Sequence, residues 1–360
     1  MILIDGYYGN KNTGDDLFVL TLFSFLGKNV KFLTSEKIEG VPSECFFFKN
    51  KFKGYQKILF VFLLLRHRKF LTGGGSVFEE KQKWSSFRGL ALIINKVIPI
   101  KMYSIGVSLS SNRDQLDNVL EEIKAYKKIY VRDLSSHDFS VNMSLINVYQ
   151  GVDLAYFNKF NNLITDNNIL TIIHCPYESV RKLDLNNERR RDENLVNYLI
   201  NLIKNENFKE IQLLEFNGHR TDGDLKKVEY IKKALSFMNL KVKIIRYSTD
   251  PNEMIKAISR SKFVISTRLH GAIIAHIVGI PFTLLEYHIK CSSWLDTIGY
   301  PKDLRIGDAE IPSIKFNEVY MKIIKNIGKE EHNKKLKILL DDGKRIKKEF
   351  SSIINYNTGI

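Results

Sequence analysis

Arg268 and His270 are the side chains of this sequence whose types and spacing best suit chemistry on an anion. They follow an apolar run at residues 263–265 and precede a segment that is apolar on nearly every face up to Gly279. This order predicts a short buried strand, a tight turn and a buried helix. The turn then lies at the carboxyl end of a strand, where α/β sheets gather ligands and where helix N–H groups attract anions. A permanent cation beside a titratable imidazole indicates anion binding with proton transfer. A surface arginine and a capping histidine would be the purely structural interpretation.

A glycine-punctuated loop near the amino terminus is the second candidate. Residues 1–5 predict a buried strand, residues 6–16 (GYYGNKNTGDD) a loop, and residues 17–26 a helix. This order is typical of the start of a doubly wound α/β domain. Gly9 and Gly14 have the spacing of a P-loop, but Asp15 and Asp16 stand where that motif needs Lys and Ser or Thr, so we reject an NTP site. Asp15 fits either a helix N-cap or a carboxylate that acts on a sugar hydroxyl.

Composition sets the class of protein and the range of partners. A chain of 360 residues favours two domains of about 150 residues each. There are 55 Lys and Arg against 40 Asp and Glu, a net charge of +15 that we take to be distributed along the chain. Nucleic acid, an acidic small substrate, a pyrophosphate-linked acceptor or an anionic membrane surface would each fit this charge.

The cysteines and the apolar runs indicate the compartment. Cys45, Cys175 and Cys291 are isolated and lack metal-ligand spacing, which favours a reducing compartment. The amino terminus does not have the pattern of a signal peptide, and no apolar run reaches the ~18 residues that span a bilayer. We therefore expect a cytoplasmic protein, with the inner face of the cell membrane as a further hypothesis.

The rest of the chain alternates predicted strands and helices. Residues 73–76 (GGGS) predict a second turn from strand to helix, and the Asn-rich residues 158–168 predict a linker. Residues 58–65 are an apolar octet flanked by basic residues, which fits either a buried element or an amphipathic element that contacts a membrane. Further strands are predicted at residues 29–33, 70–72, 98–107, 129–133, 148–154, 169–174, 211–216, 242–245, 263–266 and 282–285. Helices are predicted at residues 193–204, 224–238 and 251–259.

This alternation predicts an α/β fold with two doubly wound Rossmann-like domains facing a cleft, a GT-B-like layout, followed by a helical tail. The expected boundaries are residues 1–160 for the first domain, 169–316 for the second, and 317–360 for a tail that packs back on the domains.

Several short segments resemble the polysaccharide pyruvyl transferase family. They are GYYGNKNTGDD, LTGGGSVF, YSIGVSLS, VRDLSSHDF, QGVDLAYF and STRLHGAIIAHIVGIPF, the last followed by EYHIKCSSWLDTIGY. Each is weak alone, but together, in order from residue 6 to residue 300, they are fairly specific. The resemblance implies a GT-B-like fold and transfer of the enolpyruvyl group of phosphoenolpyruvate to sugar hydroxyls as a ketal. Such transfer serves the biosynthesis of bacterial capsule, exopolysaccharide or cell-wall polymers.

The resemblance also implies roles for particular residues. The triplet Arg268-Leu269-His270 matches the family's Arg-Leu-His signature, and Tyr287 and Lys290 match the Tyr-x-x-Lys segment that follows. Arg268 can grip a carboxylate or phosphate of the donor bidentately, and Lys290 would add a point charge. His270 would be the general acid that protonates the donor's methylene carbon.

The first domain would then be the acceptor side and the second the donor side. Asp15 would orient or deprotonate the acceptor hydroxyl, and Arg132 is a further donor cation. Asn12, Gly74 and Gly75 complete the expected binding set. No metal or cofactor is expected apart from phosphoenolpyruvate as donor substrate. The expected partners are a sugar or lipid-linked oligosaccharide acceptor and peripheral contact with an anionic membrane, but no nucleic acid.

Two alternatives stay open. One is a GT-B glycosyltransferase with Arg268 and Lys290 on the diphosphate of a nucleotide sugar, although the loop before the final helix lacks a glutamate pair for the ribose. The other is a non-catalytic partner in polysaccharide assembly, which would have little use for converging Arg, His and Lys side chains. His174 and Cys175 end a predicted strand where we would expect a donor-binding arginine.

Overall fold

The structure is a computed structural model whose described part forms two compact units. Unit 1 comprises Met1–Asn10, Asp15–Asn158 and Leu339–Ile360, and unit 2 comprises Lys11–Gly14 and Lys159–Ile338. The residues expected to form a separate tail are therefore divided between the two units. The described residues are 1–48, 53–78, 83, 86–109, 116–158, 160, 168–176, 185–221, 223–307, 313–326 and 330–355.

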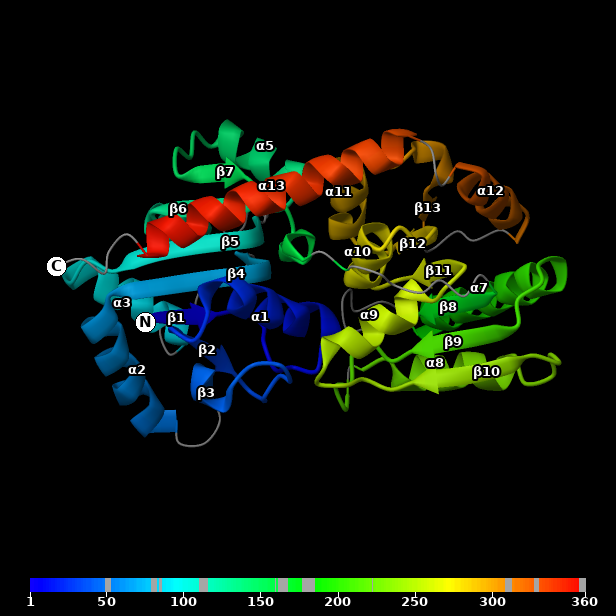
Figure 1. The fold of residues 1–360 in the computed structure, drawn as a ribbon, viewed down its shortest axis with the longest axis horizontal. Coiled ribbons are helices and arrows are strands. Elements are labelled where there is room, and N and C mark those ends of the chain that lie inside the picture. Colours follow the sequence, from blue (N-terminus) through cyan, green and yellow to red (C-terminus); the bar gives the residue numbers. More distant parts are fainter. Residues whose placement is uncertain are drawn as a thin grey trace. The chain divides into compact units, whose positions relative to one another are not determined.

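Unit 1 is built on a seven-stranded parallel sheet with the strand order β3-β2-β1-β4-β5-β6-β7 (Figure 1). The chain adds strands on one side of β1 and then on the other, so the order reverses between β1 and β4. That position is the switch point of a doubly wound sheet. The strands are β1 (Ile2–Asp5), β2 (Val30–Thr34), β3 (Phe46–Phe48), β4 (Lys69–Phe78), β5 (Lys101–Leu109), β6 (Lys128–Val131) and β7 (Val148–Gln150).

The helices of unit 1 connect successive strands of this sheet. The last helix, α13 (Glu330–Asn355), begins in unit 2 and ends in unit 1, where Phe350 is fully buried. The others are α1 (Thr13–Leu26), α2 (Lys53–His67), α3 (Phe87–Val97), α4 (Leu116–Lys124) and α5 (Leu134–Asn142), with short 3₁₀ turns at Ser43–Cys45 and Leu154–Phe157.

Unit 2 repeats the same winding in a six-stranded sheet with the order β10-β9-β8-β11-β12-β13. Its switch point lies between β8 and β11, which pair in parallel with Thr171 opposite Val264. The strands are β8 (Ile169–Ile173), β9 (Glu210–Leu214), β10 (Lys241–Ile245), β11 (Phe263–Ser266), β12 (Phe282–Glu286) and β13 (Ile306–Gly307). The helices are α7 (Leu185–Asn205), α8 (Leu225–Ala234), α9 (Pro251–Ser259), α10 (Leu269–Ile277), α11 (Ile289–Thr297) and α12 (Ser313–Asn326), with a 3₁₀ turn at Lys302–Leu304.

Each sheet has its own apolar core. The central strands are buried on both faces, as in Leu3 and Ile4 of β1 and Leu170 and Ile172 of β8, because helices cover both sides of a parallel sheet. The sequence-based prediction of an α/β fold with two doubly wound sheets is confirmed.

Some local predictions need correction. Residues 73–76 were predicted to form a turn after a strand, but they lie inside β4. Gly74 and Gly75 have φ angles of 72° and 83°, and the pairing with β5 shifts register after Gly75. Only glycine adopts such angles without strain, so these glycines make a bulge within the strand and not its end.

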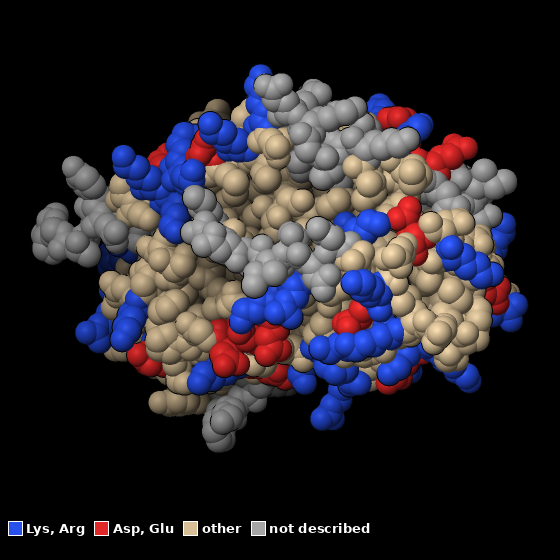
Figure 2. Space-filling view, turned by 45° about the vertical axis from the view of Figure 1, so that its right-hand side comes forward, with Lys and Arg blue, Asp and Glu red and all other residues tan. Residues whose placement is uncertain are grey.

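The octet at residues 58–65 is part of the helix α2, which is one of the forms that its sequence allowed. Strand β3 was not predicted. The predicted linker at residues 158–168 lies almost entirely outside the described residues. No helix in the described part of the chain is both long enough and apolar enough to span a membrane. On the face shown in Figure 2, Lys and Arg are interspersed with Asp and Glu.

Candidate active site

The predicted strand, turn and helix around Arg268 are present in unit 2. Ser266 ends β11, Arg268 is the N-cap residue of α10, and the helix is buried from Gly271 to Ile277. The backbone N–H of Thr267 donates to the carbonyl of Ile173 at 2.8 Å, which ties the end of β11 to the end of β8. The triplet therefore lies at the switch point of the sheet, where doubly wound folds bind ligands.

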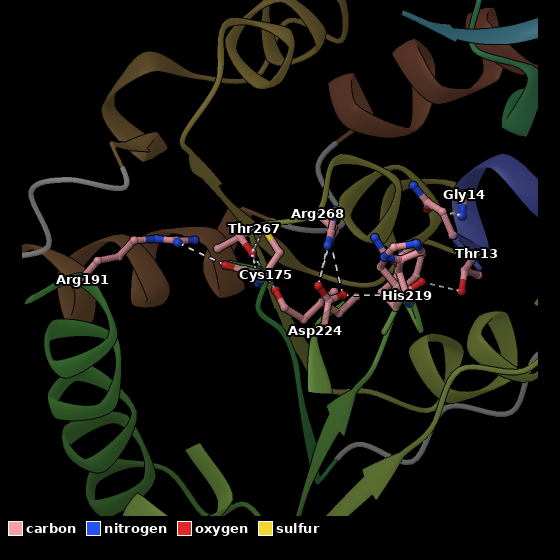
Figure 3. A network of polar contacts seen from close by, with 12 residues as sticks. Thr13, Gly14, Cys175, Arg191, His219, Asp224, Thr267 and Arg268 are labelled. Atoms are coloured by element: carbon pink, nitrogen blue, oxygen red, sulfur yellow. Dashed lines mark hydrogen bonds and ion pairs between the residues drawn. The ribbon is translucent and has the colours of Figure 1, made fainter. Parts of the chain in front are cut away.

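The Arg268 guanidinium points toward Asp224, which precedes α8 (Figure 3). Nε lies 3.2 and 3.3 Å from the two carboxylate oxygens, and Nη2 lies 2.5 Å from Oδ1. The Asp224 side chain is fully buried and that of Arg268 is 13% exposed. Burial opposes the charge on Arg268, but the Asp224 carboxylate more than offsets it and raises the pKa of the guanidinium above its ordinary value. Arg268 is thus a fixed cation, and Nη1 is the guanidinium nitrogen not used in this ion pair.

His270 lies in the first turn of α10, with its ring against Gly14. A Cβ atom on Gly14 would lie 2.1 Å from Nδ1 of His270 and 2.3 Å from Cγ. Residue 14 must therefore lack a side chain for the imidazole to occupy this position. Asn12, predicted to bind substrate, accepts a hydrogen bond from the Gly14 N–H at 3.1 Å and so caps α1.

The loop at residues 11–14 is held by the segment that follows β9. Thr13 donates to the Phe216 carbonyl from its backbone N–H at 3.1 Å and from its hydroxyl at 2.9 Å. The Gly218 N–H donates to the Lys11 carbonyl at 2.8 Å, and Lys11 has a positive φ of 58°, uncommon for a residue other than glycine. The Asn217 N–H donates to Asp224 at 2.9 Å. The loop beside His270 and the carboxylate beside Arg268 are thus held by the same segment.

Arg191 is a second arginine at the switch point, and sequence analysis did not identify it. It lies on α7, is 4% exposed, and its Nη1 donates to the carbonyl of Cys175 at 3.1 Å (Figure 3). The Cys175 N–H in turn donates to the Thr267 hydroxyl at 2.9 Å, next to Arg268. An arginine was expected here at the end of the predicted strand, but it comes from the following helix. Its position in an Arg-rich helical stretch gave no signal that it is buried.

His174 does not provide the missing cation. It is fully buried, and its Nε2 lies 2.7 Å from Oδ1 of Asp192. Burial, together with the charge of Arg191, lowers the pKa of His174 to about 4 despite the carboxylate, so the ring is neutral near neutral pH. The Asp192 Oδ2 also accepts from Lys227 at 2.5 Å, and Lys227 pairs with Glu188. This network fixes α7 on both sides of Arg191.

The remaining predicted residues of unit 2 lie close to the two arginines. Tyr287 follows β12 and is 1% exposed. Burial raises its pKa, against the lowering effect of Arg268, so it is a neutral phenol. The Lys290 ammonium lies 5.9 Å from the centroid of the Tyr287 ring. Leu269, 6% exposed, is a packing residue of α10.

His276 and His219 have other partners, whereas His288, the N-cap residue of α11, lies beside Tyr287 with its ring centroid 6.2 Å from that of the tyrosine. His276 is buried in α10, with its ring edge-on to Phe282 and Trp294 at 6.2 and 5.9 Å, as expected of a core residue. His219 is exposed in the loop after β9, where its Nδ1 lies 3.1 Å from the Thr221 hydroxyl.

Asp15, Gly74 and Gly75 lie at the switch point of the first sheet. Asp15 lies in the first turn of α1 and is 8% exposed. A Cβ atom on Gly75 would lie 3.7 Å from its Oδ1, whereas one on Gly74 would lie 2.2 Å from the Phe18 ring. Gly74 thus has a packing reason to be glycine, and Gly75 lies beside the Asp15 carboxylate.

Arg132 is buried in unit 1. Its Nη1 lies 2.9 Å from Asp153, Nε donates to Ser108 at 2.8 Å, and Nη2 donates to Ser76 at 3.4 Å. These contacts account for Arg132 as a structural residue that joins the ends of β4, β5 and β6. Its role as a donor cation stays a prediction.

The residues that the structure brings together in unit 2 are Arg268, His270, Arg191, Tyr287 and Lys290. They combine cations with one imidazole near the amino-terminal end of α10. This combination suits an anionic substrate that must also receive a proton. Within the described residues there is no group of His, Cys, Asp or Glu side chains that could hold a metal ion. The three cysteines are buried and form no disulfide.

Comparison with solved structures shows the fold. The chain is similar to UDP-GlcNAc 2-epimerase from Methanocaldococcus jannaschii, with a TM-score of 0.62 and 12% identity over 97% of this chain and 98% of that one. It is also similar to the epimerase from Neisseria meningitidis bound to UDP-GlcNAc, with a TM-score of 0.57 and 12% identity over 97% and 99% of the chains. Phytolacca americana UGT2, complexed with UDP-2fluoro-glucose and pterostilbene, gives 0.55 and 10% over 98% and 99%. The fold is GT-B-like.

The family is shown by the sequence. No curated protein gives a match to this chain. The family model described as polysaccharide pyruvyl transferase, however, matches residues 12–289, which include the last residues of the glycine loop, Arg191, Asp224 and the Arg268-Leu269-His270 triplet. This match spans well over half of the chain, and the chain therefore belongs to the polysaccharide pyruvyl transferase family.

Proposed function

We propose that the protein transfers the enolpyruvyl group of phosphoenolpyruvate to sugar hydroxyls as a ketal, in the biosynthesis of a bacterial capsule, exopolysaccharide or cell-wall polymer. The observation that carries the proposal is the placement of Arg268, Arg191 and His270 at one switch point, within the region matched by the family model.

The donor carries a carboxylate and a phosphate, so its site needs more than one fixed cation. Arg268 is held by Asp224 through Nε and Nη2, which orients Nη1 for an anionic oxygen. Arg191 and Lys290 supply further positive charge from α7 and α11. The N-terminal turn of α10 adds backbone N–H groups that favour the same charge.

His270 is the proposed general acid. A ketal of pyruvate joins two sugar oxygens to one carbon, so two hydroxyls must react. His270 gives a proton to the methylene carbon of the donor while the first hydroxyl oxygen bonds to the neighbouring carbon. The second hydroxyl oxygen then displaces phosphate from that carbon. One phosphoenolpyruvate and one sugar diol give one ketal and one inorganic phosphate, and a hydroxyl proton restores the imidazole.

The acceptor is proposed to be a sugar or a lipid-linked oligosaccharide. Asp15, beside Gly75 in unit 1, is the candidate for orienting or deprotonating its hydroxyl, and this role stays a prediction. We also propose that the protein works in the cytoplasm at the inner face of the cell membrane.

Phosphate release tests this function directly. Purified protein is incubated with phosphoenolpyruvate and a lipid-linked or free oligosaccharide acceptor, and inorganic phosphate is measured together with the gain in acceptor mass. We expect both to rise in equal amounts, with no release from the Arg268→Ala variant.

Donor binding can be measured without the acceptor. Phosphoenolpyruvate at a hundred times its Kd should stabilise the native state by about 2.7 kcal/mol and raise Tm, and salt should weaken the effect. The solved neighbours bound to UDP-sugars make nucleotide sugars the competing donor class. If UDP-sugars raise Tm and phosphoenolpyruvate does not, the glycosyltransferase alternative replaces this proposal.

A further inference from the structure

The outward face of α2 in unit 1 carries an exposed apolar stripe. Tyr55, Ile58 and Phe62 are 67%, 71% and 56% exposed. They are spaced three and four residues apart and so lie on one side of the helix. The opposite side is buried: Phe60 and Leu64 are inaccessible to solvent, and the Phe60 ring packs 4.9 Å from that of Phe87 at the start of α3. The stripe is therefore not needed for the packing of α2 on unit 1.

The neighbouring helix α3 also carries exposed apolar residues. α3 packs against α2, and its Ile93 and Val97 are 47% and 82% exposed, one turn apart. Single exposed apolar residues are ordinary on soluble proteins, whereas several on adjacent helices are typical of a binding surface.

The part of the sequence that contains α2 and α3 is rich in basic residues. Residues 45–113 contain thirteen Lys and Arg but only two acidic residues, Glu79 and Glu80. This segment thus holds most of the chain's excess of basic residues, which corrects the expectation that the excess is evenly distributed. Arg66, exposed one turn after Phe62, and Lys96, exposed beside Val97, lie at the ends of the two helices.

The carboxyl end of α2 brings several of these charges together. The Lys101 N–H donates to the Arg68 carbonyl at 2.8 Å, which places the start of β5 beside the end of the helix. Partial burial, then the amino terminus, Arg66 and Lys69, lower the pKa of His67. The pKa of Lys69 is also lowered, first by burial and second by the charge of Lys101. Burial is the larger cause of both shifts, and the neighbouring cations act in the same direction.

We propose that the outward face of α2, with Tyr55, Ile58 and Phe62 beside the basic end of the helix, binds the surface of an anionic lipid bilayer. An amphipathic helix with aromatic and aliphatic residues flanked by arginines is suited to lie in the headgroup region. A nucleic acid would engage the charges but offers an exposed isoleucine no apolar phase to enter. A second copy of this surface would bring like charges together. This proposal rests on the proposed function, because it says which surface makes the membrane contact proposed there. The test below uses no donor or acceptor, so it can fail without contradicting the proposed enzymatic activity.

Vesicle sedimentation of the full-length protein tests the proposal. Phosphatidylcholine vesicles are compared with vesicles of phosphatidylcholine and phosphatidylglycerol in a three-to-one ratio. The wild type should sediment with the mixed vesicles, weakly with the neutral ones, and progressively less as salt rises. The Ile58→Ser/Phe62→Ser variant should lower the partition coefficient at least about tenfold, because each side chain loses its transfer into the apolar phase.

Matched variants separate the surface from general effects. Ile146→Ser/Phe237→Ser removes two apolar side chains that are 91% and 66% exposed elsewhere, and it should bind vesicles as the wild type does. Arg66→Gln/Lys96→Gln should lower the partition coefficient by about fivefold per charge. Lys232→Gln/Lys233→Gln, on exposed positions of α8, should change it little.

Insertion of the α2 stripe into the bilayer can be measured at position 62 alone. A Phe62→Trp variant should show indole quenching by brominated lipid in the mixed vesicles, and an Ile146→Trp variant should not. The proposal is overturned if the wild type binds both kinds of vesicle equally or if Ile58→Ser/Phe62→Ser binds as the wild type does. Binding to single-stranded RNA without binding to mixed vesicles would also overturn it and would make this face a nucleic-acid site. The phosphate-release assay tests the proposed function separately, so none of these outcomes decides that function.

Discussion

The imidazole of His270 fills the space that a side chain on Gly14 would need: a Cβ atom there would lie 2.1 Å from Nδ1. Gly14 lies at the start of α1 and His270 at the start of α10, and both belong to unit 2 because residues 11–14 are bound to the segment after β9. The glycine loop near the amino terminus therefore sets the position of the proposed general acid.

Gly14→Ala tests this relationship. The methyl group forces the imidazole to move, because the overlap is with the near end of the ring and not with the tip of a flexible chain. Such overpacking costs about 1–3 kcal/mol of stability. We expect a folded variant whose kcat for phosphate release falls toward that of a variant lacking the imidazole. Gly307→Ala is the control, since nothing lies within 4 Å of a Cβ at that position. Wild-type kcat in Gly14→Ala would show that this ring position is not required.

The Arg268–Asp224 pair predicts a large cost in stability when only one partner is removed. Arg268→Ala leaves the fully buried Asp224 carboxylate without its ion pair, a change that typically costs about 3–5 kcal/mol. In Arg268→Ala/Asp224→Ala the uncompensated charge is gone, so the double variant should lose less than the sum of the two single variants. Urea denaturation of the four proteins measures the coupling. Additive losses would mean that the pair contributes no coupling energy to the fold.

Arg191 is predicted to bind the donor, and the same helix offers a matched control. Arg191→Ala should raise KM for phosphoenolpyruvate by about tenfold or more, as expected for loss of a hydrogen bond to a charged group. Arg189, two residues earlier, is exposed and pairs with Glu193 one turn along α7, so Arg189→Ala should leave KM unchanged. Steady-state kinetics at fixed ionic strength make the comparison. Equal KM values for the two variants would remove Arg191 from the donor site.

The fold was largely predictable because buried parallel strands have continuous apolar sequences. Runs such as residues 169–173 and 263–265 stand out between polar segments, and the polar turn after the second run gave the position of Arg268. The bulge at Gly74 and Gly75 was mistaken for a turn because glycines give the same signal in both cases.

The partners of the site residues could not be predicted from the sequence. Asp224 pairs with Arg268, and Gly14 contacts His270, across separations set by strand order and not by local pattern. Arg191 lies in the stretch NNERRRDEN, where a helical periodicity does not say which of three consecutive arginines faces the core. Burial of a charged residue is decided by its tertiary partner, here the Cys175 carbonyl.

The buried His174 predicts a pH dependence of stability. Its pKa is about 4 in the folded protein against 6.5 ordinarily, chiefly because of burial, so the unfolded chain binds more protons between these values. The free energy of unfolding should therefore fall as pH drops from about 6.5 to 4, by about 3 kcal/mol at most. Urea denaturation of the wild type and of His174→Asn should show that the variant lacks this part of the slope.

Glu122 also changes the pH dependence of stability, so a variant without this carboxyl is needed as a control. Burial raises the pKa of this carboxyl to about 7 despite Arg88, so the folded state binds the extra proton between pH 4.5 and 7. Its contribution is lost as pH rises, opposite in sign to that of His174. The experiment is therefore done in a Glu122→Gln background as well, where the His174 slope should be steeper. An identical pH dependence with and without His174 in both backgrounds would contradict the prediction.

The last prediction separates proton transfer from donor binding within the triplet. His270→Gln keeps a polar side chain of similar length but cannot deliver a proton, so kcat should fall about 10²–10⁴-fold while KM for phosphoenolpyruvate changes little. His219→Gln, the same substitution at an exposed histidine of unit 2, should behave as the wild type does.

If a folded His270→Gln turned over at the wild-type rate, His270 would have only a structural role. His174 could not replace it readily, because that ring is buried against Asp192 and neutral near neutral pH, which would leave His219 and Asp15 as candidates.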